Sequence, residues 1–124
     1  MSAVEKFLTA VEKVCDIYEG LKDIEVSGGD PAKVRALLVE LRDRLVDLSV
    51  SAGVLRERGV ESLALLDFYI APILYQIQLA LLLRANTSVI TLINGELARL
   101  VARLKIIAEA IRGAQTRQQA PTLT

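Results

Sequence analysis

Apolar residues recur along most of this chain in alternating steps of three and four, the spacing of one face of an α-helix. Three rows of apolar residues with this spacing extend over several heptads, and further apolar residues beside them widen the rows: Leu8, Cys15, Leu37, Val101 and Ala108. The pattern therefore predicts three long amphipathic helices with coiled-coil-like seams. The rows are Val4, Phe7, Val11, Val14, Tyr18, Leu21; Val34, Leu38, Leu41, Leu45, Leu48, Ala52, Leu55; and Ile90, Ile93, Leu97, Leu100, Leu104, Ile107, Ile111.

Capping residues and glycines give the expected helix boundaries. Ser2 with Glu5 has capping-box spacing, and Asp30-Pro31 is a typical helix start. We expect the first helix to fray over residues 20–25, and the second to bend or end over residues 49–53 before stopping at Gly59. Further boundaries are expected at Ser62 as an N-cap, at Asn86, Thr87 and Ser88 as a cap of the last helix, and at Gly113 as its end.

Between these rows lies the most apolar segment, residues 63–83. At about 100° per residue it carries two apolar arcs, so it should contact partners on two sides. Pro72 should kink the helix or divide it at Ala71. The broad arc holds Leu63, Leu66, Ile70, Ile73, Leu74, Ile77 and Leu81; the narrow arc holds Leu65, Phe68, Leu79, Leu82 and Leu83.

These elements predict an all-α fold, an antiparallel four-helix bundle whose third helix is central, most buried and kinked near Pro72. We expect one bundle domain over residues 1–113 and a polar tail over residues 114–124. No strand pattern or internal repeat is visible in the sequence.

Composition indicates that this apolar surface is hidden by association. Hydrophobic residues make up 52% of the chain but aromatic residues only 4%, and the mean hydropathy is +0.40. We therefore expect a homo-oligomer, a dimer or a higher state, with the narrow arc as its interface. A membrane span is disfavoured because Asp67, Pro72, Gln76 and Gln78 interrupt residues 63–83.

Charge is balanced overall, with 15 basic and 15 acidic side chains, but the ends differ. Residues 1–29 hold three basic and six acidic side chains, whereas residues 86–124 hold five basic and two acidic. The first and last helices should attract each other. A basic C-terminal region leaves open a nucleic-acid-associated or viral structural protein. We favour salt-bridged helix flanks, because Glu96 and Glu109 lie among the basic residues.

Chemistry-bearing residues are few. Cys15 is the single cysteine, which precludes an internal disulfide, and no histidine is present. We expect no catalytic, cofactor or metal site and no enzymatic activity. Asp67, Tyr75 and Gln78 share one side of the central helix and could orient an apolar small molecule. For Asp67 itself we favour a structural role, in which its carboxylate caps the first turn of the central helix and favours the helix dipole.

The interpretation we favour from sequence is a non-enzymatic, self-associating structural or interaction module. The alternatives are the nucleic-acid-associated protein and the binder of an apolar small molecule within the bundle. The first residues lack a signal peptide's basic and apolar regions, so a cytoplasmic location is expected. Scarce Asn, Met and Cys beside abundant Leu, Val, Arg and Glu suggest a thermophilic source.

Overall fold

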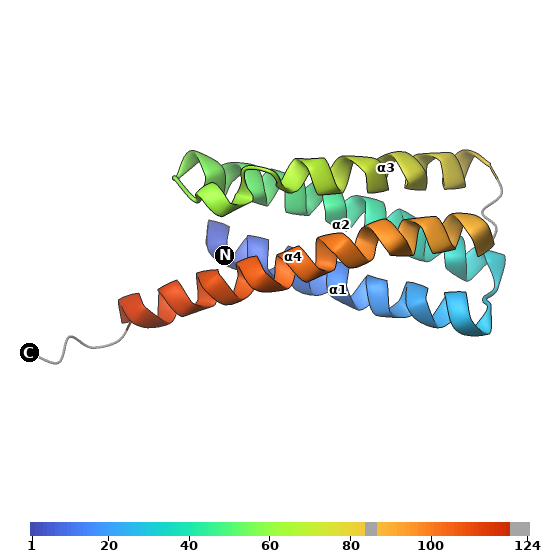
Figure 1. Cartoon of the computed structure of the whole chain (residues 1–124), viewed down its shortest axis with the longest axis horizontal. Coiled ribbons are helices and arrows are strands. Elements are labelled where there is room, and N and C mark those ends of the chain that lie inside the picture. The colour runs from blue at the N-terminus through green and yellow to red at the C-terminus, as the bar shows by residue number, and fades with distance from the viewer. Residues whose placement is uncertain (84–86, 120–124) are drawn as a thin grey trace, which may run out of the picture.

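The computed structural model, described for residues 1–83 and 87–119, is an up-down-up-down bundle of four antiparallel helices (Figure 1). No strand occurs in those residues, so the predicted all-α four-helix bundle is confirmed. The helices are α1 (Ala3–Ser27), α2 (Pro31–Glu57), α3 (Leu66–Leu82) and α4 (Thr87–Gln119), with a short 3₁₀ turn η1 (Glu61–Leu63) before α3.

The three heptad rows of the sequence form the core. Each row faces the bundle axis, and apart from the half-buried Val4, Tyr18 and Ile111 its residues are buried. Helix α1 packs mainly against α2 and α4, and α3 packs against the same two helices. The diagonal pair α1 and α3 are therefore separated by α2 and α4.

The predicted starts of the first two helices are confirmed. The Ser2 Oγ accepts a hydrogen bond from the Glu5 amide at 3.1 Å, and the Asp30 carboxylate accepts one from the Ala32 amide at 3.2 Å. The chain turns after α1 at Gly28 and after α2 at Gly59, with φ of 78° and 92°. Glycine adopts this left-handed region without the steric cost of a Cβ, so these two turns reverse the chain cheaply.

The predicted fraying of α1 and the predicted end of α2 over residues 49–53 are wrong, and a bend of α2 there stays a prediction. Helix α1 continues through residues 20–25 because Leu21 and Ile24 are buried against the other helices. Helix α2 continues through residues 49–53 for the same reason, since Ala52 and Leu55 lie in the core. A mid-helix glycine costs only about 1 kcal/mol, which burial of one large apolar side chain offsets.

The boundaries of the last two helices also differ from expectation. Ser62 lies in η1, and α3 begins after Leu65 without a side-chain cap. Helix α3 runs through Pro72 as one element, so it is not divided at Ala71; a kink there stays a prediction. Helix α4 passes Gly113 and reaches Gln119, so the first residues of the expected tail are helical and project beyond the N-terminus of α1 (Figure 1). The Asn86 part of the predicted cap lies outside the described residues.

Helix α3 buries only one of its two apolar arcs. Only 28% of the most apolar stretch within Glu61–Leu82 is buried. The reason is the square arrangement of the bundle, in which each helix has two main neighbours and no helix is enclosed. One apolar arc of α3 enters the core, and the other faces outward.

Candidate interaction surface

Helix α3 and the turn before it carry two heptad rows of apolar residues, which lie on nearly opposite faces of the helix. The inner seam is the row that enters the core, and all its residues are buried. The outer seam repeats the same spacing two residues later, which rotates it by about 200° around the helix. The inner seam is Leu63, Leu66, Ile70, Ile73, Ile77 and Ala80, and the outer seam is Leu65, Phe68, Pro72, Tyr75, Leu79 and Leu82.

The outer seam is largely exposed to solvent. Phe68 and Leu82 are each 75% exposed, Tyr75 is 65% exposed and Leu65 is 59% exposed. Pro72 is also exposed, and Leu79 is half-buried. Heptad spacing is the pattern that packs one helix against another, yet no helix of this chain covers this face among the described residues.

Polar contacts hold α3 along both edges of the outer seam. On the α2 side, the Asp67 carboxylate meets the Arg56 guanidinium at 3.1 Å and accepts from the Ser49 hydroxyl at 3.0 Å. On the α4 side, the Arg103 guanidinium lies 4.7 Å from the centre of the Tyr69 ring. These contacts fix the rotation of α3 about its axis and so direct the outer seam away from the bundle.

Four of the five predicted interface residues are largely exposed in the structure. Leu65, Phe68 and Leu82 belong to the outer seam, and Leu83, which is 67% exposed, follows directly after α3. Leu79 is the least exposed of the five. That these residues form an oligomer interface stays a prediction. The sequence interpretation missed Pro72 and Tyr75, although the 3-4-3-4-3 spacing that includes them is present in the sequence.

The predicted polar pocket of Asp67, Tyr75 and Gln78 stays a prediction. Asp67 is engaged by Arg56 and Ser49, so its carboxylate already has partners within the chain. Tyr75 lies on the outer seam, and Gln78 is exposed beside it. The hollow at the end of the bundle and the hollow at Cys15 are lined by other residues.

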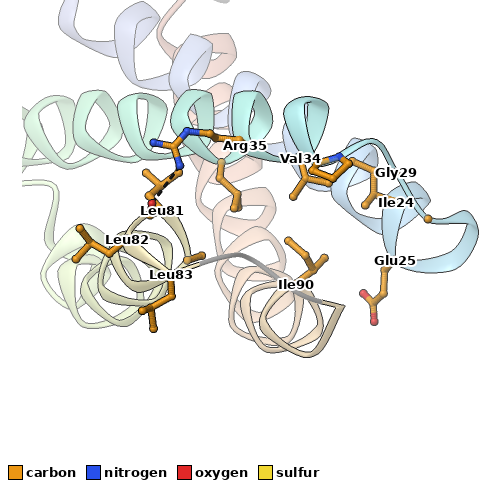
Figure 2. A pocket seen from close by; sticks show the side chains of 13 residues that line it. Ile24, Glu25, Gly29, Val34, Arg35, Leu81, Leu82, Leu83 and Ile90 are labelled. Atoms are coloured by element: carbon orange, nitrogen blue, oxygen red, sulfur yellow. Dashed lines mark hydrogen bonds between the residues drawn. The ribbon is translucent and has the colours of Figure 1, made fainter.

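A cavity of about 720 Å³ lies at the end of the bundle where α1 meets α2 and α3 ends (Figure 2). Arg35 crosses one side of it, and its guanidinium donates to the Leu81 carbonyl at 3.1 Å (Figure 2). Much of the lining is aliphatic, and the volume is in the range of small-molecule sites. The lining residues are Ile24, Glu25, Gly28, Gly29, Pro31, Val34, Arg35, Leu38, Ala80, Leu81, Leu82, Leu83 and Ile90.

Asn94, a buried polar residue next to that cavity's Glu25, was missed in the sequence. Its amide nitrogen donates to the Leu21 carbonyl at 3.1 Å and to the Glu25 carboxylate at 2.7 Å, while its Oδ1 is buried without a partner among the described residues. These bonds join α4 to the C-terminal part of α1. Its position in the sequence could have predicted its burial, because Asn94 follows Ile93 directly and so lies next to the α4 heptad row.

A smaller hollow of about 310 Å³ lies between α1 and α4 at Cys15. Burial raises the pKa of the Cys15 thiol, and the positive charges of Lys105 and Arg112 lower it by less. Arg112 also pairs with Glu12 at 3.4 Å, so the expected attraction between the first and last helices is present. A thiol held in its neutral form is a poor nucleophile, so burial lowers the reactivity of Cys15.

Among residues 1–83 and 87–119 no three carboxylate or cysteine side chains gather as metal ligands.

The segment Glu61–Leu82 is long and apolar enough to cross a membrane by length and composition, with a mean hydropathy of 1.6. Core helices of soluble proteins meet the same criteria, so this finding alone does not place it in a bilayer.

Comparison of the chain with protein-family models, with curated protein sequences and with solved structures finds no match in any of the three.

Proposed function

We propose that this chain is a non-enzymatic interaction module that associates with copies of itself through the outer seam of α3. The observation that supports this proposal is a complete heptad row left uncovered on a helix whose opposite row forms the core. A second seam of this kind is a helix-binding surface rather than a scatter of exposed apolar residues.

The size of the surface supports the same proposal. The exposed parts of Leu65, Phe68, Tyr75, Leu82 and Leu83 together present roughly 700 Å². The largest apolar patch of a typical monomer is about 300–600 Å², and one partner of a standard interface buries about 800 Å². The outer seam together with Leu83 therefore exposes more surface than the apolar patch of a typical monomer, and this area is close to what a stable dimer needs.

A lysine at Leu82 tests this function. It places a charge on the seam at an exposed position, so it should dissociate the oligomer while the helical circular dichroism spectrum stays unchanged. Leu92→Lys is the matched control, because Leu92 is 58% exposed on α4 and lies off the seam. Light scattering should give a monomer for Leu82→Lys and the wild-type mass for Leu92→Lys. An L82K variant that stays assembled would contradict the assignment.

The cavity of Figure 2 favours a second candidate function, the binding of an apolar small molecule at the end of the bundle. Its aliphatic walls suit a hydrocarbon chain, and Arg35 at its side suits a ligand with an acidic group. Native mass spectrometry of the purified chain tests this directly. A co-purifying organic acid that is lost in Leu38→Phe, which fills the cavity, would support it; a mass equal to the sequence alone would remove it.

A further inference from the structure

The outer seam has the same spacing read in either direction along α3. Its steps are three, four, three, four and three residues, so the row is symmetric about a point between Ile73 and Leu74. A contact between two identical copies related by a two-fold axis requires a patch that is complementary to itself. Building on the proposed function, we infer that two copies pair through antiparallel α3 helices, with the two-fold axis crossing between Ile73 and Leu74.

This arrangement pairs every seam residue with a different one. Phe68 meets Leu79 of the second copy, and Pro72 meets Tyr75 of the second copy. Leu65 meets Leu82 at both ends of the interface. A parallel pair would instead place each residue against its own equivalent, so that the two Tyr75 rings collide while the two compact Pro72 rings leave space. Antiparallel pairing sets the smaller side chain against the larger one, and it also opposes the two helix dipoles favourably.

The flanks of the outer seam fit a second copy of the chain. A two-fold axis between antiparallel helices brings each flank against the same flank of the other copy. One flank carries Tyr69 and Gln76, and the other carries Ala71 and Gln78. None of these four side chains is charged; beside them, the Arg103 guanidinium of α4 lies against the Tyr69 ring. A different protein partner is usually selected by complementary charges on the flanks of such a helix, and these four α3 positions offer none.

The nearest carboxylate is also neutralised within the chain. Asp67 lies further round the helix, towards α2, where Arg56 pairs with it at 3.1 Å. Helix α3 itself has no basic residue between Leu66 and Leu82. The interface therefore depends on apolar contact, and its affinity should not fall as salt increases.

Cysteine cross-linking tests the direction and register of the pair, in a Cys15→Ala background. The double variant Phe68→Cys/Leu79→Cys should form a disulfide-linked dimer under mild oxidation, because residue 68 of one copy meets residue 79 of the other. The two sites cannot link within one chain, since eleven residues of helix separate them by about 16 Å. The variant Leu65→Cys/Leu82→Cys repeats the test at the seam ends and leaves the central residues intact.

Phe68→Cys alone should not cross-link, because its equivalents lie about 16 Å apart in the antiparallel pair. Leu92→Cys/Ile106→Cys, at two exposed α4 positions, is the background control. Three results would overturn the inference: a dimer from F68C alone, which indicates a parallel pair; a dimer from Val50→Cys on the outer side of α2; or no dimer from either double variant. If the wild-type chain still doubles its mass in those cases and Leu82→Lys still reduces it to a monomer, the proposed function survives; a wild-type monomer removes both.

Discussion

Asn94 shows how one residue connects two helices that are far apart in sequence. Its amide bridges the Leu21 carbonyl and the Glu25 carboxylate, at the cost of one buried oxygen without a partner. A satisfied pair of donors and an unsatisfied acceptor have opposite effects on stability, so the net contribution of the side chain should be small. Changes in its charge, however, should have large effects.

Asn94→Asp should destabilise the fold by about 3 kcal/mol, because it buries a carboxylate against the Glu25 carboxylate and the Leu21 carbonyl. Urea denaturation followed by circular dichroism measures this. Asn94→Leu, which removes both the donors and the unpaired oxygen, should stay within about 1 kcal/mol of the wild type. Adding Glu25→Gln to N94D should recover part of the loss, since the new amide can donate. Equal stability of N94D and N94L would contradict this description.

Cys15 provides a pH-dependent test of the α1–α4 contact. Burial raises the pKa of its thiol, so the native chain holds less thiolate at a given pH than the unfolded chain does. Alkylation of the native protein should therefore be slower and should rise with pH around a higher midpoint than in concentrated urea. Because the unfolded thiol ionises first, this group also reduces stability as the pH rises from the unfolded pKa to the folded pKa. Equal midpoints in both states would show that α4 does not cover Cys15.

At the scale of elements, substitutions on the inner and outer seams of α3 should differ in their effect on the free energy of unfolding. Ile77 on the inner seam is fully buried, so Ile77→Ala should cost about 2–5 kcal/mol of unfolding free energy. Leu82→Ala on the outer seam removes a side chain that is 75% exposed, so it should cost less than about 0.5 kcal/mol to the monomer. Denaturation at micromolar and submicromolar protein separates monomer stability from association. Comparable losses in both variants at the lowest concentration would show that the outer seam is packed within one chain.

The element scale also shows which features the sequence could predict. The heptad rows identified the core faces because the periodicity of a helix does not depend on how its side chains pack. The Ser2 and Asp30 caps could be recognised because each involves only residues that are close in sequence. The fraying expected near Gly20 and the helix ends expected near Gly53 and Gly113 did not occur, because weak local preferences yield to the helix around them. Which arc of α3 faces outward depends on the square packing of four helices, which no local pattern specifies.

For the candidate surface, the sequence identified Leu65, Phe68, Leu79, Leu82 and Leu83 as a distinct arc. It did not reveal that Tyr75 belongs to the same row, because the tyrosine hydroxyl suggested a polar face. It also could not show that Arg56 forms an ion pair with Asp67, since the two residues lie on separate helices. Contacts between helices depend on the rotation of each helix in the bundle, and this rotation is a property of the assembled core.

The largest group of exposed apolar side chains in the molecule lies along α3 and at its two ends, while further exposed apolar side chains lie on the other helices. Association through the outer seam should be driven by the hydrophobic effect, so high salt should preserve the oligomer. Nucleic-acid binding through the basic C-terminal region would behave oppositely, because it weakens steeply as salt increases. Two of those basic residues, Arg103 and Arg112, are already engaged by Tyr69 and Glu12.

The most direct test of self-association is the solution mass of the wild-type chain, measured by light scattering over a dilution series at 0.1 M and 1 M salt without detergent. We predict a dimer of the 13.5 kDa chain whose mass does not fall at the higher salt, and which dissociates only on dilution. A 13.5 kDa monomer at all concentrations would contradict the central claim. Binding of that monomer to neutral lipid vesicles would then assign the outer seam to a lipid surface.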